Sequence, residues 1–273
     1  MEVTSIAEEL LFTTVRIEAR TPSGECVGTG FIFDYILEDK EYLFLVTNKH
    51  VISGADKGSL TFIRSDGQRP LLGESYRLEI NEFEKMWFGH KENDIDVAVT
   101  PFVPILKHIY NQGVSVFFKA IPSNLAPNEE TLKGLDAVEE VLFIGYPCGI
   151  WDERNLLPIV RRGITATPIY IDFNGKRQFL IDASVFPGSS GSPVFIYNAG
   201  TYWDKKSGHI IAGRRLFFLG ILSEAFQMED TGEIIIPTTT RPIVRVRQLL
   251  DLGIVFKAQT IIEAIESFLR LIT

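Results

Sequence analysis

The chain has 273 residues, of which 45% are hydrophobic and 23% charged, and its net charge is -8. This length is enough to bury a full core in one or two domains, and the composition is typical of a soluble globular protein. The acidic balance argues against nucleic acid as a partner, because nucleic acid needs a basic surface. No apolar run reaches the roughly 18–20 residues that a membrane helix requires, so no membrane is expected as a partner either.

The N-terminal stretch "MEVTSIAEELLFTTV" carries acids within its first apolar run and has no basic region, which is unlike a signal peptide. The two cysteines, Cys26 and Cys148, lack the spacing of a disulfide framework or a metal site. We interpret them as free thiols and expect a cytoplasmic protein. No cofactor and no metal are predicted from the sequence.

Strand-like segments follow one another through most of the chain. They are short, rich in β-branched and aromatic residues, and separated by Gly, Pro, Asn and Asp, which predicts an all-β sandwich or barrel protein. In chain order these segments cover residues 13–19, 28–36, 41–48, 59–64, 96–102, 114–121, 140–147, 158–172, 178–186, 192–198, 216–226 and 233–239.

Helical patterns are few. Ser5 and Glu8 form a capping box that predicts one short helical turn at the start of the chain. A second helix is predicted over residues 240–253, and a third after the capping box of Thr260 and Glu263. The third helix has one apolar face, formed by Ile261, Ile265, Phe268 and Ile272. We expect this face to dock on the protein's own core.

Residues 187–194 read "PGSSGSPV", which is either an ordinary glycine-rich turn or a nucleophile beside an oxyanion hole. The second interpretation needs a base. Of the four histidines, His50 follows a strongly apolar strand, whereas His90, His108 and His209 lie in polar segments where a structural role is the better interpretation.

An acid that orients the histidine is offered by "ENDIDVAVTPF". Asp94 and Asp96 share one strand face, so their position alone does not separate them, and we favour Asp96 because it leads directly into the strand. A metal site built from His90, Asp94 and Asp96 lacks the spacing of recognised sites.

The order His50, Asp96, Ser190 and the strings around these residues resemble the chymotrypsin-fold (trypsin-like) serine proteases. The resemblance is greatest to the bacterial HtrA-like and glutamyl endopeptidase group, and it covers about residues 12–256. The strings that carry it are "GTGFIF", "TNKHV", "DVAV", "VLFIGYPCG", "DASVFPGSSGSPVF", "LGILSE" and "IIIP".

The resemblance implies two antiparallel six-stranded β-barrels with a C-terminal α-helix. The first barrel, residues 1–120, carries the histidine and the aspartate. The second, residues 121–257, carries the nucleophile, and residues 258–273 form the helix. The stretch 103–135 is interpreted as the connection between the halves.

The resemblance also assigns chemical roles. His50 takes the proton from Ser190, Asp96 holds the imidazole, and the backbone amides of Gly188 and Ser190 form the oxyanion hole. Ser189 stands where secreted trypsins have an aspartate that pairs with a newly cut N-terminus. This difference removes the need for activation by cleavage and implies control from elsewhere, by an activating protein partner or a larger assembly.

The substrate pocket is less well defined. The resemblance places Ser184 at its base and Leu222, Ser223, Glu224 and Ala225 along its wall, with Ser223 supporting the aspartate. Neither the aspartate of trypsin nor the histidine of glutamyl endopeptidases is present at the matching positions, so an uncharged P1 residue of modest size is expected. Glu224 either favours a basic side chain near the scissile bond or simply faces solvent.

Two functions are carried forward. The first is a serine endopeptidase, an enzyme acting on a protein or peptide substrate through a Ser-His-Asp triad and an acyl-enzyme intermediate. The alternative is a catalytically silent peptide-binding or regulatory module that keeps the protease fold. Complete triad candidates favour the enzyme, because a retired site tends to lose its nucleophile or its base.

Overall fold

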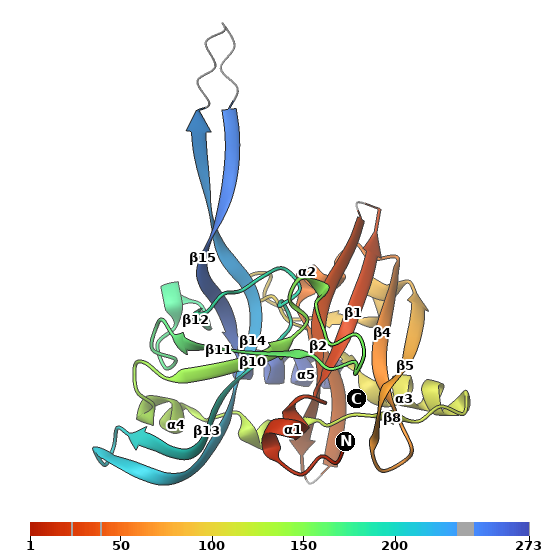
Figure 1. Ribbon diagram of the computed structural model, residues 1–273, viewed down its shortest axis with the longest axis horizontal. Coiled ribbons are helices and arrows are strands. Elements are labelled where there is room, and N and C mark those ends of the chain that lie inside the picture. Colours follow the sequence, from red (N-terminus) through yellow and green to blue (C-terminus); the bar gives the residue numbers. More distant parts are fainter. Residues whose placement is uncertain (23, 39, 234–242, 273) are drawn as a thin grey trace, which may run out of the picture.

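The structure is a computed structural model that describes residues 1–22, 24–38, 40–233 and 243–272, with the backbone alone at 224–233 and 243–249. Its described residues form two β units that lie next to each other (Figure 1). Among the helices described, none has the length and apolar character that crossing a membrane requires.

The first unit is a nine-stranded sheet, whose main path runs β5-β4-β1-β2-β3-β7-β6 while β8 pairs with β4 and β9 with β2. Its strands are β1 (Thr14–Thr21), β2 (Gly24–Leu37), β3 (Lys40–Thr47), β4 (Lys57–Ser65), β5 (Pro70–Asn81), β6 (Phe88–Gly89), β7 (Ala98–Pro101), β8 (Val116–Phe117) and β9 (Ile121–Pro122). The helices around it are α1 (Ile6–Leu10), α2 (Lys49–Ile52), α3 (Phe102–Asn111) and the 3-10 turns η1 (Phe83–Met86) and η2 (Ser123–Leu125).

The second unit is a closed barrel in the order β10-β11-β12-β15-β14-β13. Its strands are β10 (Glu140–Gly145), β11 (Ile159–Thr165), β12 (Gln178–Asp182), β13 (Pro193–Asp204), β14 (His209–Glu233) and β15 (Ile243–Lys257). With them come α4 (Glu129–Gly134), the turns η3 (Pro147–Gly149) and η4 (Phe173–Gly175), and the C-terminal α5 (Ala258–Ile272). The pair β14–β15 extends far beyond the barrel (Figure 1).

The all-β fold with a second six-stranded barrel and a C-terminal helix agrees with the sequence prediction. The first unit differs from it, because its described strands form an open nine-stranded sheet and not a closed barrel of six. Two of its short strands, β8 and β9, come from the segment after α3, which was interpreted as the connection between the halves and in which residues 114–121 were also predicted to be strand-like. Short pairs form there because Phe117 lies beside β4 and Ile121 beside β2.

The prediction of a helix over residues 240–253 was wrong. The described part of this segment is strand β15, which pairs with β14 from Glu233 opposite Ile243 onward. The residues "IVRVR" at 243–247 alternate with a period of two, as in a strand, and long pairing with β14 overrides the local helical pattern. At the other predicted starts, Ser5 and Glu8 form the expected capping box. However, α5 begins at Ala258, and the Thr260 hydroxyl donates to the carbonyl of Lys257.

The apolar face of α5 docks on the core through Ile261 and Ile265, which are fully buried, and Phe268 packs against it, but Ile272 is 65% exposed, so the predicted face does not reach that far. The same cluster contains Phe31 from β2 and Phe218 from β14, whose ring centroids are 5.4 Å apart. Burying one such side chain contributes about 1.5–3 kcal/mol. One continuous apolar core therefore fixes the two β units to each other, and with them the groups that each unit contributes to the cleft.

Candidate active site

His50 is placed by the end of β3. The strand is buried up to Thr47 and Asn48, and the chain then turns into the short helix α2, so that His50 is exposed while its backbone is anchored. The imidazole Nδ1 lies 2.5 Å from Oδ2 of Asp96. The backbone N–H of His50 donates to the other oxygen, Oδ1, at 3.1 Å. One carboxylate therefore fixes both the ring and the backbone of this histidine.

Asp96 is bound from the second unit as well, because the Ser223 hydroxyl donates to its Oδ2 at 2.6 Å. Burial raises the pKa of Asp96, but the hydrogen bonds from His50 and Ser223 and the charge of the imidazole outweigh that effect and hold the pKa below its ordinary value. Asp94 is exposed, and the carboxylate that bonds to His50 is that of Asp96. The contact with His50 therefore distinguishes the two aspartates, which their position on the strand did not.

The lowered pKa of Asp96 has a consequence for stability. A carboxylate whose pKa is depressed by folding stabilises the native state above its unfolded pKa, and this contribution is lost as the pH falls through the folded pKa. We expect the difference in free energy of unfolding between a Ser190→Ala protein and its Asp96→Asn derivative to shrink as the pH falls below 3.8, the ordinary pKa of an aspartate. Urea unfolding at each pH measures it. A difference that stays unchanged down to pH 2.5 contradicts the assignment.

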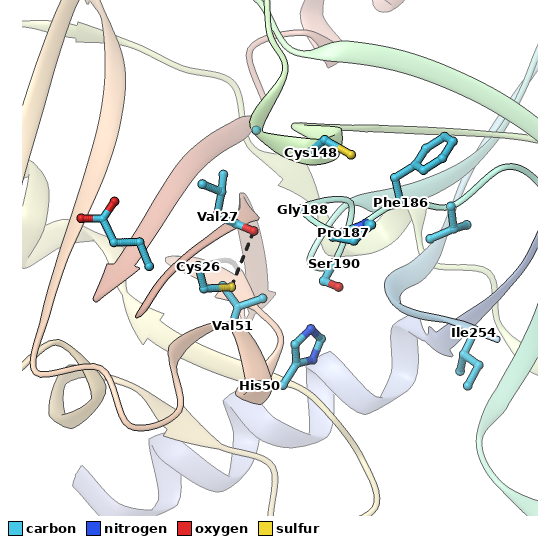
Figure 2. A pocket seen from close by; sticks show the side chains of 13 residues that line it. Cys26, Val27, His50, Val51, Cys148, Phe186, Pro187, Gly188, Ser190 and Ile254 are labelled. Carbon is cyan, nitrogen blue, oxygen red and sulfur yellow. Dashed lines mark hydrogen bonds between the residues drawn. The ribbon is translucent and has the colours of Figure 1, made fainter. Parts of the chain in front are cut away.

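Ser190 lies in the turn between β12 and β13 of the second unit and shares a cleft of about 850 Å³ with His50. Figure 2 shows the two side chains together in this cleft. The Ser190 hydroxyl donates to the carbonyl of Ser223 at 2.5 Å. The fold thus brings together a serine and a histidine that are far apart in the sequence and come from different β units.

The turn just before Ser190 has a defined conformation. The N–H of Ser189 donates to the carbonyl of Phe186 at 3.0 Å, and Gly188 has a φ of 88°. Proline in the second position and a glycine of positive φ in the third make this a type II turn. A Cβ at Gly188 would lie 2.5 Å from the carbonyl oxygen of Tyr146, so this position requires glycine for space as well as for conformation.

The central peptide of the turn is oriented by a neighbouring loop. The N–H of Cys148, in η3, donates to the carbonyl of Pro187 at 2.5 Å. In a planar trans peptide the C=O and the following N–H point in opposite directions. The N–H of Gly188 therefore points away from the Cys148 amide that binds the Pro187 carbonyl.

The backbone N–H groups around Ser190 differ in whether they have a hydrogen-bond acceptor. Those of Ser189, Gly191 and Ser192 donate to backbone carbonyls. Those of Gly188 and Ser190 have no acceptor among the described residues. Two available N–H groups, that of Ser190 itself and that of Gly188 two residues before it, suit a negatively charged oxygen, which is the arrangement of an oxyanion hole.

The wall of the cleft beyond Ser190 is apolar and is formed by Val185, Phe186 and Ile254. The guanidinium of Arg161 lies over the ring of Phe186, 5.0 Å from its centroid. The remaining lining residues are Glu25, Cys26, Val27, His50, Val51, Cys148, Gly149, Pro187, Gly188 and Ser190.

A second hollow of about 530 Å³ adjoins the first and shares His50 and Ile254 with it. Lys49 and Asp94 line this hollow. Burial lowers the pKa of Lys49, against the opposing charges of Asp96 and Asp94. The two hollows therefore meet at His50 and Ile254.

The predicted pocket residues differ in where they lie. Leu222, predicted on the wall of the pocket, is fully buried in the core of the second barrel and does not line the cleft. Ser184, predicted at the base of the pocket, is half-buried, and its neighbours Val185 and Phe186 line the cleft. Ser223 contacts Asp96, and the side chains of Glu224 and Ala225 lie outside the described residues.

Outside the cleft, His90, Glu92 and Glu263 form a cluster of possible metal ligands. Ligand atoms of His90, Glu92 and Glu263 lie within 4.8 Å of one another. Arg177 forms ion pairs with both carboxylates, at 2.5 Å to Glu92, and His90 Nε2 lies 3.2 Å from Glu263. The guanidinium already balances the two acids, so this cluster is an ion-pair network that joins α5 to the segment before Asp96.

Two residues of the site were not found from the sequence. Asn48 is fully buried, and its side-chain Nδ2 donates to the backbone carbonyl of Asp96 at 2.6 Å. Thr29 is fully buried on β2, and its hydroxyl donates to the carbonyl of Gly188 at 3.0 Å. Both belong to strings that carried the resemblance, "TNKHV" and "GTGFIF", but their contacts exist only once distant segments meet.

Solved structures similar to this chain include three proteases. The serine endoprotease from Yersinia pestis has a TM-score of 0.51 and 18% identity, over 98% of this chain and 68% of that one. The active form of the Rv3671c protease from M. tuberculosis has a TM-score of 0.44 and 17% identity, over 94% of this chain and 81% of that one. The HtrA-type protease AlgW with a tripeptide has a TM-score of 0.49 and 15% identity, over 96% and 61%. The similarity to the Yersinia pestis protease, with its TM-score of 0.51, supports a common fold.

No curated protein matches the sequence. The sequence family described as the trypsin-like peptidase domain matches residues 28–201. This match covers most of the chain and contains His50, Asp96 and Ser190. The chain therefore belongs to the trypsin-like peptidase family, a family of serine endopeptidases.

Proposed function

We propose that the chain hydrolyses peptide bonds with Ser190 as the nucleophile, His50 as the base and Asp96 as the acid that orients the histidine. The observation that carries this proposal is the pair of available amides at Gly188 and Ser190, in a cleft that also holds the bonded pair of His50 and Asp96. A serine alone is a poor nucleophile and needs such a base.

The proposed reaction follows from these contacts. Asp96 accepts a hydrogen bond from Nδ1 of His50, which leaves Nε2 able to accept a proton. Rotation of the Ser190 side chain moves its hydrogen bond from the Ser223 carbonyl to that nitrogen. The Ser190 oxygen then bonds to the peptide carbonyl carbon as its proton passes to Nε2 of His50. The C–N bond breaks as His50 gives this proton to the leaving amine, which leaves an acyl-enzyme. His50 next takes a proton from water, the water oxygen bonds to the acyl carbon, and the ester C–O bond breaks as His50 returns the proton to Ser190.

The two amides stabilise the oxygen that becomes negative in this step. Gly188 and Ser190 each provide one N–H, and one such donor typically lowers the barrier by about 3–4 kcal/mol. The type II turn supports a working enzyme over a silent module, because it leaves these donors available. We therefore expect basal activity without a partner, and an activating partner or assembly would raise it by acting on this turn.

We also propose that the enzyme works in the cytoplasm. Cys26 and Cys148 are free thiols in the structure, and unpaired cysteines suit a reducing compartment.

The apolar wall supports a substrate preference. Val185, Phe186 and Ile254 offer no charged partner to a side chain inserted beside Ser190. Burying an unpaired charge is costly, whereas an aliphatic side chain gains from leaving water. We propose that the P1 residue is uncharged and apolar.

The experiment is digestion of a denatured protein mixture, with the new N-termini identified by mass spectrometry. We expect cleavage after Val, Leu, Ile or Phe, and a kcat/KM about 100-fold lower for peptides with Lys or Glu at P1 than with Leu. The Ser190→Ala protein is the control and should produce no new termini. A preference for Lys or Arg would contradict the apolar pocket and point to Glu224, while no cleavage by the wild type would contradict the proposed function.

A further inference from the structure

Thr29 connects the two β units at the nucleophile turn. Thr29 lies on β2 of the first unit and is fully buried. Its hydroxyl donates to the carbonyl of Gly188 at 3.0 Å and accepts from the N–H of Tyr146 at 3.2 Å, and both partners belong to the second unit. One side chain thus binds the turn and the loop that lies against it.

The backbone of Thr29 makes a parallel set of contacts. Its N–H donates to the carbonyl of Ser190 at 2.9 Å, and its own carbonyl accepts from the Thr47 hydroxyl at 2.7 Å. The approach is very close. A Cβ at Gly191 would collide with the Thr29 carbonyl, and a Cβ at Gly145 would lie 2.5 Å from the Thr29 hydroxyl oxygen. The position of Thr29 relative to the turn is therefore tightly fixed.

Gly188 needs such restraint. A glycine adopts positive and negative φ about equally well, so a Pro-Gly turn changes type by a flip of its central peptide unless that peptide is held. Here the Cys148 amide binds the carbonyl of Pro187, which precedes Gly188, and the Thr29 hydroxyl binds the carbonyl of Gly188 itself. The two restraints come from opposite β units and together fix both peptides that flank Gly188.

We propose that Thr29 is a positioning residue that keeps the amides of Gly188 and Ser190 directed at the reacting carbonyl. This inference rests on the proposed function of these amides. It makes the oxyanion hole depend on the packing between the two units, because the first unit supplies the hydroxyl that holds the turn of the second.

The test compares Thr29→Val, which keeps the shape and loses the hydroxyl, with Thr29→Ser, which keeps the hydroxyl. We expect Thr29→Val to lower kcat by about 10- to 100-fold with little change in KM, somewhat less than the roughly 10²–10³-fold cost of losing an oxyanion donor itself. A peptide aldehyde, whose adduct places a negative oxygen in the hole, should bind more weakly by a similar factor. Thr29→Ser should restore most of both.

Thr13→Val is the matched control, because Thr13 is another buried threonine, whose hydroxyl donates to the carbonyl of Leu10 at 2.8 Å, outside the turn. We expect it to leave kcat within about twofold. Equal kcat and aldehyde affinity in Thr29→Val and Thr29→Ser would overturn the proposal. So would an equal loss of kcat in Thr13→Val, because the effect would then be one of general stability.

A second readout does not depend on activity. Amide hydrogen exchange over residues 186–192, measured in a Ser190→Ala background, should be faster with Thr29→Val than with Thr29→Ser. If the wild type cleaves no peptide, the proposed function fails, and the exchange rates still decide whether Thr29 holds the turn. Identical exchange in the two variants would overturn the proposal even in an active enzyme.

Discussion

Replacing Ser190 by alanine is expected to lower kcat for peptide hydrolysis by about 10⁶-fold, the order of magnitude seen when a triad serine is removed. The reason is that Ser190 supplies the hydroxyl that lies beside its own amide and that of Gly188 in the cleft it shares with His50. Some rate above that of water should remain, because the donors and the rest of the cleft are unchanged. Steady-state hydrolysis of a peptide with leucine at P1 measures the change.

Ser189→Ala is the matched control for this experiment. Ser189 is the adjacent serine, it is buried, and its hydroxyl oxygen has no hydrogen-bond partner among the described residues. Removing it should leave kcat within a few-fold and should not reduce the free energy of unfolding, since no bond is lost. Equal losses in the two variants would mean that the turn is sensitive to any change and that Ser190 has no special role.

Replacing Asp96 by asparagine is expected to lower kcat by about 10⁴-fold with little change in KM. Asparagine keeps the shape, and its Oδ1 can still accept from the backbone N–H of His50. However, an amide cannot provide the negative charge that stabilises the imidazolium, and its NH2 favours the wrong tautomer of the ring. The hydrogen bond from Ser223 to Oδ2 is lost as well.

Asp94→Asn distinguishes the two aspartates that sequence position could not separate. Asp94 is exposed and lines the neighbouring hollow, so its loss should change kcat by only a few-fold and act, if at all, on KM. A loss of about 10⁴-fold in Asp94→Asn together with a mild effect of Asp96→Asn would contradict the geometry described for His50.

Local signals were sufficient for several features. The strand pattern predicted an all-β fold. The motif "TNKHV" at the end of β3 and the motif "PGSSGSPV" in the loop that leads into β13 indicated His50 and Ser190 as candidates, because each motif lies next to a buried strand. The C-terminal helix and the Ser5–Glu8 capping box follow from the same kind of local pattern, whereas the second barrel was implied by the family resemblance.

Other features depend on segments that meet only in the fold. Strand β15 has a mixed local pattern, and its pairing with β14 decides its structure. Leu222 was placed in the pocket by resemblance, but the alternation of β14 turns it into the barrel core. Thr29 contacts Gly188, 159 residues away, and no spacing rule in the sequence relates the two positions.

The most direct test of the central claim is labelling by a fluorophosphonate probe, which reacts with a serine only when a base activates it. The account predicts that the wild-type protein is labelled on Ser190, and that labelling disappears in both Ser190→Ala and His50→Ala, provided that each variant is folded. No labelling of folded wild-type protein, or labelling that persists in His50→Ala, would contradict it.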